Sequence, residues 1–357
     1  MSFVGDTKDT NEATKIYDPL DPTVLRLLDP EFVEYYNSVL GTKIATHHIP
    51  LSEVRANPEK WSGSWCKDYT GSPGVKNFTI PSDDGYQVKC RSYNPDPARH
   101  GEGPFPVHIN FHGGGFVFGD LTADAEFCMM LKDRLGIIVI DVDYRLCPEH
   151  RFGKNIGDSW AALKWVHEHA SETNGLPDSI SIGGISAGGQ IACVLQHMAR
   201  DARVPLKFAI LSVPTTDFHT YFPTPDHHAP FHPLPSVARF AKAPSLPASR
   251  LAFFKSHVFP DEHRDFIEKE VPLMWRAPLH APNFKELCDA FVITAECDPL
   301  VDEGEAYGRK MVEAGGMVIF KRYLGVPHPF MHMTKALAKA RQYENDVCAA
   351  LKMAHGL

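Results

Sequence analysis

A serine flanked by glycines is the most chemically informative feature of the sequence. Residues 184–188 read Gly-Ile-Ser-Ala-Gly, the form G-x-S-x-G, between a predicted strand at 179–182 and a helix predicted to start just after Ser186. A serine on such a sharp turn is held in a strained backbone conformation that raises its hydroxyl above the sheet. The following helix N-terminus favours developing negative charge. A turn in which serine merely caps the helix is the alternative, but this context favours Ser186 as a nucleophile.

Three consecutive glycines follow another predicted strand. Residues 111–116 read Phe-His-Gly-Gly-Gly-Phe, directly after a short apolar run. Consecutive glycines let backbone N–H groups converge on one point, and such donors stabilise the oxyanion of acyl transfer. We predict donors at Gly113, Gly114 and Ala187, the residue after the nucleophile. A phosphate-binding loop is the alternative, but no Gly-Lys-Ser/Thr follows. His112 is interpreted as a structural residue of this loop.

The acid and the base are sought downstream of Ser186, because the expected order is serine, acid, histidine. Asp298 lies just past a predicted strand at 290–295, and His328 lies just past one at 317–323. In this interpretation His328 accepts the serine proton, and Asp298 fixes its tautomer and supports the imidazolium.

Other acids and histidines compete for these roles. Asp302 falls inside the next predicted helix, and Glu296 and Asp289 lie nearer the strand. Among the nineteen histidines, His332 is predicted on the final helix, and four more lie in a proline-rich stretch: His219, His227, His228 and His232. The group at 226–228 could suggest a metal site, but ligand spacing such as HExxH is missing. We expect no metal and no cofactor.

The elements that must position these residues alternate between strand and helix. Apolar runs predict eight strands, at 78–80, 88–93, 107–111, 137–142, 179–182, 208–213, 290–295 and 317–323. Helices are predicted at 122–135, 158–170, 301–314 and 330–352, besides the one after Ser186. This rhythm predicts an α/β fold whose mainly parallel sheet has helices on both faces and begins with an antiparallel pair. Residues 1–70 form a partly helical lead-in, and 214–282 form a proline-rich insertion into a domain made of 71–213 and 283–357.

Composition excludes several other classes of protein. The 357 residues are 43% hydrophobic and 22% charged, with a net charge of −8, which disfavours disorder and nucleic-acid binding. The N-terminus lacks a signal-peptide pattern, and no apolar run is long enough to span a membrane. Without an export signal, the eight scattered cysteines favour buried thiols over a disulfide framework. We therefore expect a cytoplasmic enzyme.

Four motifs together resemble one family. Residues 112–116 are similar to its HGGGF element, 144–150 (YRLCPEH) to YRLAPEH, 184–189 to GxSAGG, and 298–304 (DPLVDEG) to DPLxDEG. The chain thus resembles the hormone-sensitive-lipase-like branch of the α/β hydrolases, which includes bacterial and fungal esterases and plant carboxylesterases. That resemblance implies an α/β-hydrolase sheet, a helical cap that includes part of the N-terminal segment, and cofactor-free hydrolysis of short- to medium-chain or aromatic esters. It also implies bracing roles for three residues of the second motif, Arg145, Pro148 and Glu149.

The sequence departs from the family pattern at two positions. Ile185 stands where many members carry Asp, and Pro329 follows the histidine where Gly or Ala is common. Neither change removes a catalytic group, and Pro329 should stiffen the histidine loop.

The hypothesis is a serine carboxylesterase whose cap, formed by 1–70 and 214–282, encloses the ester. Aromatic residues are the candidates for its pocket lining: Trp61, Trp65, Phe116, Phe118, Phe222, Phe253 and Phe254. Such a pocket favours larger or ring-containing esters, including those of secondary metabolites. Two alternatives remain, a non-catalytic receptor on the same scaffold and a lyase, amidase or C–C hydrolase using the same site. The resemblance also suggests a homodimer through the last strand, 317–323.

Overall fold

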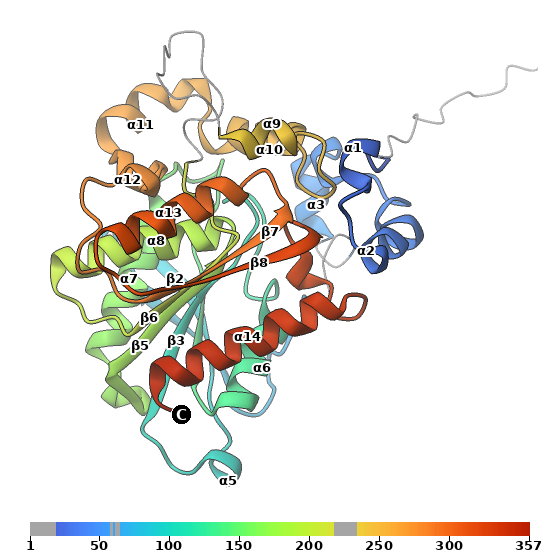
Figure 1. Ribbon diagram of the computed structural model, residues 1–357. Coiled ribbons are helices and arrows are strands. Elements are labelled where there is room, and N and C mark those ends of the chain that lie inside the picture. Colours follow the sequence, from blue (N-terminus) through green and yellow to red (C-terminus); the bar gives the residue numbers. More distant parts are fainter. Residues whose placement is uncertain (1–18, 58–59, 61–64, 218–233) are drawn as a thin grey trace, which may run out of the picture.

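Eight strands form one twisted sheet at the centre of the computed structural model, which describes residues 19–57, 60, 65–217 and 234–357 (Figure 1). Their order in the sheet is β1-β2-β4-β3-β5-β6-β7-β8. The bounds are β1 Val75–Pro81, β2 Gln87–Tyr93, β3 Phe105–Phe111, β4 Ile138–Asp143, β5 Gly175–Ile185, β6 Phe208–Ser212, β7 Ala290–Cys297 and β8 Val318–Pro327. The pairs that involve β2 are antiparallel and the others are parallel. The predicted α/β class, with its antiparallel start, is confirmed.

Helices cover both faces of this sheet, as the apolar strands require. Every residue of β3 is buried, which is typical of a central parallel strand. Helices α7 (Lys154–Glu168), α8 (Ala187–Ala202) and α13 (Val301–Glu313) pack on one face, and α6 (Ala125–Leu135) and α14 (Ala338–His355) on the other (Figure 1). Each face thus has its own hydrophobic core. None of the helices in the described ranges is long and apolar enough to cross a membrane.

Two segments, the insertion and the N-terminal segment, add short helices near the carboxyl ends of the central strands. The insertion contributes α9 (Pro235–Arg239), α10 (Ala248–Val258), α11 (Arg264–Glu270) and α12 (Leu273–Arg276), drawn in gold and orange in Figure 1. The N-terminal segment contributes α1 (Pro22–Leu25), α2 (Pro30–Tyr35) and α3 (Leu51–Ala56). Helix α10 reaches the end of β5, since its Phe254 borders a cavity shared with Ser186.

The last predicted helix is interrupted. Residues Phe330–His332 form a 3-10 helix, η6, and the α-helix begins only at Ala338. Phe330 and Met331 are fully buried, so this stretch is fixed by packing into the core. The N–H of Ala338, left open at the helix start, donates to Glu31 Oε2 at 2.8 Å. The prediction that His332 lies on the final helix is therefore wrong, because η6 ends at His332 and α14 begins only at Ala338.

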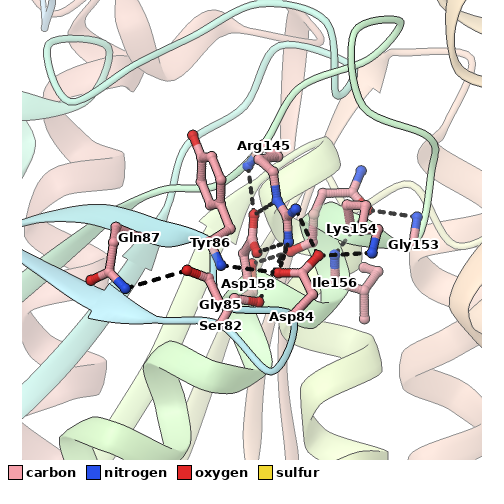
Figure 2. A network of polar contacts seen from close by, with 12 residues as sticks. Ser82, Asp84, Gly85, Tyr86, Gln87, Arg145, Gly153, Lys154, Ile156 and Asp158 are labelled. Atoms are coloured by element: carbon pink, nitrogen blue, oxygen red, sulfur yellow. Dashed lines mark hydrogen bonds and ion pairs between the residues drawn. The ribbon is translucent and has the colours of Figure 1, made fainter.

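Arg145 joins the loop after β4 to the β1–β2 hairpin (Figure 2). Its guanidinium donates to both carboxylate oxygens of Asp158 at 2.8 and 2.6 Å, and to both of Asp84 at 2.9 and 3.1 Å. Asp158 is fully buried and also accepts the Arg145 N–H. The Arg145 and Lys154 cations hold the pKa of Asp84 well below its usual range. Arg145 is thus a bracing residue, as the family resemblance implied.

Candidate active site

Ser186 occupies the turn between β5 and α8 in a conformation rarely seen for a side-chain-bearing residue. Its φ is 58° and its ψ is −113°, between a strand that ends at Ile185 and a helix that begins at Ala187. Such strain persists only where the surrounding structure enforces it. Here the N–H of Ser186 donates to Ser212 O at 2.9 Å, and its carbonyl accepts from Gln190 N at 2.9 Å. The turn presents Ser186 at the start of helix α8.

The glycines around this serine are required by close backbone approach. A Cβ added at Gly188 would lie 1.8 Å from Phe111 O, and one at Gly184 would lie 2.4 Å from the same oxygen. The end of β3 therefore presses against the turn that carries Ser186. This contact explains both fixed positions of the G-x-S-x-G pattern.

Asp298 and His328 meet because β7 and β8 are paired in parallel. Cys297 is the register partner of Pro327, so the next residue of each strand emerges at the same edge of the sheet. Asp298 Oδ2 lies 2.7 Å from His328 Nδ1, and Asp298 Oδ1 accepts from Leu300 N at 2.9 Å. With Nδ1 held by the carboxylate, Nε2 of His328 is the nitrogen left for a proton from a nucleophile.

The competing acids have other partners. Asp302 Oδ2 accepts from Ser236 N at 2.8 Å, and Glu296 Oε2 accepts from Gly325 N at 2.8 Å. Asp289 precedes β7, at the opposite end of the strand from Asp298. The four histidines of the insertion and the group at 226–228 lie outside the described residues. Within the described ranges, no cluster of three or more His, Cys, Asp or Glu side chains is arranged to hold a metal ion.

The glycine loop after β3 lies beside the serine turn. A Cβ added at Gly113 would come 3.1 Å from Ile185 O. Gly114 has a φ of 116°, which a residue with a side chain rarely adopts. The N–H groups of Gly113 and Gly114 donate to no acceptor in the part of the chain that the structure describes. Both glycines border the same cavity as Ser186 and His328.

His112 supports this loop from behind. Its ring is fully buried and stacks on Tyr144 with centroids 4.3 Å apart, and Tyr144 Oη donates to His112 O at 2.7 Å. Its Nδ1 lies 2.8 Å from Gly113 O. His112 therefore contacts the loop and not the cavity, in agreement with the structural role expected from the sequence.

Comparison with known proteins identifies the family. Residues 108–332 match a family model described as the alpha/beta hydrolase fold. The chain belongs to the alpha/beta hydrolase family. It is similar to an AB hydrolase superfamily protein of Schizosaccharomyces pombe, with 33% identity covering 93% of this chain and 96% of the relative. It is also similar to the carboxylesterase NlhH of Mycobacterium tuberculosis, with 30% identity covering 96% of this chain and 98% of that protein.

A solved structure extends the likeness to three dimensions. The bacterial heroin esterase superposes with a TM-score of 0.79 and 27% identity, covering 92% of this chain and 98% of that one. The relatives and solved neighbours confirm the predicted resemblance to the hormone-sensitive-lipase-like branch.

Two cavities of this hydrolase meet at the glycine loop. The smaller, of about 140 Å³, contains Ser186 and His328. The larger, of about 350 Å³, extends toward α3 and the loop at 118–124. Four residues line both cavities: Gly113, Gly114, Arg250 and His332.

The predicted aromatic lining falls into three groups. Phe254 borders the serine cavity, Phe116 a small pocket next to Ser186, and Phe118 the larger cavity. Phe253 stacks on Phe118 with centroids 5.9 Å apart and borders none of these spaces. Trp65 is a core residue: it is fully buried, stacks on Phe127 and donates to Glu344, and it lines none of the three. Trp61 and Phe222 lie outside the described residues.

The sequence analysis missed several polar lining residues, of which His332 and Arg55 are two. His332 appeared there only as a competitor for the base, and Arg55 was not considered, although both border the larger cavity. Arg55 donates to Val117 O and Cys147 O and forms an ion pair with Glu149, so it ties α3 to the loops around the cavity. No local sequence pattern marks His332, because it does not share a helix with His328: β8 ends at Pro327 and the 3-10 helix η6 spans Phe330–His332.

Proposed function

We propose that this hydrolase is a carboxylesterase in which Ser186 is the nucleophile, His328 the base and Asp298 the orienting acid. The observation that carries the proposal is the 2.7 Å contact between Asp298 and His328 beside a cavity that also contains Ser186. An imidazole oriented by a buried carboxylate is the group that a serine hydroxyl needs to become a nucleophile.

The reaction proceeds in two steps. Ser186 Oγ attacks the ester carbonyl carbon while His328 Nε2 takes its proton, and the N–H groups of Gly113, Gly114 and Ala187 hold the oxyanion. The C–O bond to the alcohol breaks, and His328 returns the proton to the leaving oxygen. Water then attacks the acyl-enzyme, His328 takes the water's proton, and Ser186 leaves with that proton as the acid is released.

We propose short- to medium-chain, aromatic or secondary-metabolite esters as substrates. The serine cavity of about 140 Å³ suits a small group, while the adjoining cavity of about 350 Å³ offers space for a ring. The cap over these spaces is proposed to consist of 1–70 and 214–282. In support, the N-terminal segment contributes Thr46, Val54 and Cys66 to the larger cavity, and α10 contributes Arg250.

Pre-steady-state kinetics test the two-step reaction. Mixing the enzyme with excess 4-nitrophenyl acetate should release about one nitrophenolate per chain in a fast burst, followed by slower turnover. An enzyme that produces nitrophenolate without forming a covalent acetyl adduct on Ser186, as judged by mass spectrometry after acid quenching, would contradict the proposal.

We further propose a homodimer through β8. This strand is at the edge of the sheet, and large apolar side chains on it or next to it are exposed: Met317 at 68%, Ile319 at 39%, Phe320 at 43% and Leu324 at 59%.

We also propose a cytoplasmic location. All eight cysteines are free thiols, which fits a reducing compartment.

A further inference from the structure

A second histidine–carboxylate pair borders the cavities of this enzyme. His332 Nε2 lies 3.2 Å from Oδ1 of Asp124, whose carboxylate is fully buried. His332 lines both the serine cavity and the larger one, whereas Asp124 lines only the larger. The pair is separate from the one formed by His328 and Asp298, because no hydrogen bond between the two pairs occurs in the described chain.

The ring of His332 is held in one orientation. Its plane meets that of Trp65 edge to face, with centroids 4.8 Å apart and an interplanar angle of 76°. Trp65 is itself fixed, since it stacks on Phe127 and donates from Nε1 to Glu344 at 3.1 Å. A ring fixed in this way by packing and by a carboxylate is pre-organised for binding.

Asp124 selects the tautomer of this ring. Its Oδ2 accepts from Asn110 Nδ2 at 3.4 Å, and its Oδ1 faces His332 Nε2, so the carboxylate acts as acceptor toward both. A carboxylate beside one ring nitrogen places the proton there, which makes the other nitrogen of the neutral ring an acceptor. In His332 that acceptor is Nδ1.

Nδ1 of His332 is open to a ligand. It makes no hydrogen bond to any residue in the described ranges, and it is not among the buried polar atoms that lack a partner. The His332 side chain is 24% exposed, on the border of the two cavities. A substrate group reaching this point from the serine cavity therefore meets an acceptor nitrogen.

From this geometry we infer that His332, oriented by Asp124, is a specificity-determining residue that accepts a hydrogen bond from a hydroxyl group on the substrate. The preferred ester then carries a phenolic or aliphatic hydroxyl on the part that occupies the larger cavity. This inference rests on the proposed esterase function and adds the chemical class of the substrate. A site built to bind a hydroxyl discriminates strongly against an analogue that lacks it.

Paired esters test the inference. On the acyl side, methyl 3-(4-hydroxyphenyl)propanoate is compared with its 4-methoxy analogue. On the alcohol side, 2-(4-hydroxyphenyl)ethyl acetate is compared with its 4-methoxy analogue. We expect a hydroxyl-to-methoxy ratio of kcat/KM of about 10 in the series whose ring enters the larger cavity, which corresponds to one hydrogen bond. A ratio of one or less in both series overturns the inference.

His332→Gln separates binding from bracing. Glutamine places an amide nitrogen as far along the side chain as Nε2, so it can still donate to Asp124, but it has no counterpart of Nδ1. We expect the ratio to fall to about 1 in this variant. His263→Gln, the same change on the 3-10 helix at Asp261–His263 and away from both cavities, should keep the wild-type ratio. A high ratio that survives in His332→Gln overturns the inference.

Asp124→Asn tests the control of the tautomer. The asparagine amide can donate to Nε2 and move the ring proton to Nδ1, which would then donate equally well to the hydroxyl or the methoxy oxygen and bring the ratio to about 1. A ratio that stays at the wild-type value in this variant contradicts the assigned tautomer.

If the wild type hydrolyses neither these esters nor 4-nitrophenyl acetate, the proposed esterase function itself is contradicted. A wild type that hydrolyses them without hydroxyl preference contradicts only this inference.

Discussion

Asp298 Oδ2 lies 2.7 Å from His328 Nδ1, although 30 residues separate the two in the chain. The parallel register pairs Cys297 with Pro327. Asp298 directly follows Cys297 and His328 directly follows Pro327, so the register produces this contact. Ser186 follows β5 and borders the same cavity as His328. The proposed chemistry therefore depends on the register of the sheet as much as on the motifs.

Asp298→Asn should keep the fold and lose most of the activity. The amide can donate to Nδ1, which moves the ring proton to Nε2 and removes the base, so kcat should fall by about 10³–10⁴-fold. Steady-state hydrolysis of 4-nitrophenyl butyrate measures this loss. Asp302→Asn is the matched control, because that carboxylate binds the Ser236 N–H, and its kcat should change less than about tenfold. An equal loss in the two variants would contradict the assignment of the acid.

Gly188→Ala should destabilise the enzyme. Its Cβ would lie 1.8 Å from Phe111 O, so the strand or the serine turn must shift, and the free energy of unfolding should fall by about 1–3 kcal/mol or more. Gly157→Ala is the control, because a Cβ added there would meet no atom of the described residues within 4 Å, apart from its chain neighbours and the backbone of its own helix α7. Alanine there should raise the stability by about 0.5–1 kcal/mol. Urea unfolding followed by circular dichroism compares the two, and equal stabilities would rule out the close approach.

The strands could be predicted because an apolar run is a local signal. The bracing role of Arg145 could be expected because the family motif that implies it, at 144–150, is also a short stretch of sequence. Residues 107–111 and 137–142 are apolar runs bounded by turns. G-x-S-x-G is also a short motif, although the oxygen that excludes side chains at Gly184 and Gly188 is Phe111 O, on β3. The pairing of His332 with Asp124 was not predictable, because it joins residues 208 apart and depends on how η6 packs. Trp65 illustrates the same limit: an aromatic near a glycine- and serine-rich stretch fits a pocket or a core, and its stacking on Phe127 places it in the core.

Asp141 should make stability depend on pH. Burial raises the pKa of its carboxyl to about 7, from 3.8 in the unfolded chain, and Oδ2 has no hydrogen-bond partner in the described residues. The native state therefore binds more protons between pH 4 and 7, and the free energy of unfolding should decrease as the pH rises through that range.

Asp141→Asn removes this titration. The variant should be more stable than the wild type at pH 8 by up to about 4 kcal/mol, and the difference should vanish near pH 4, where the native aspartic acid is already neutral. Unfolding by urea at several pH values measures it. Asp178→Asn, at an exposed position, is the control and should show no such trend. A difference between Asp141→Asn and the wild type that is independent of pH would contradict the prediction.

Arg145→Met should expose the cost of an uncompensated buried charge. The change leaves the fully buried Asp158 without its guanidinium partner, so the free energy of unfolding should fall by about 3–5 kcal/mol. Lys154→Met removes only a half-exposed pair with Asp84 and should cost less than about 1 kcal/mol. Chemical unfolding of both variants decides whether the two cations differ in this way, and similar losses would contradict a bracing role for Arg145.

The most direct test of the central claim is covalent labelling with a fluorophosphonate ester, followed by peptide mass spectrometry. The proposed mechanism predicts one adduct, on Ser186, in the wild type, and markedly slower labelling in Asp298→Asn. In Ser186→Ala it predicts no adduct and a loss of ester hydrolysis of at least about 10⁴-fold. An adduct on another residue, or a Ser186→Ala protein that still hydrolyses esters at the wild-type rate, would contradict it.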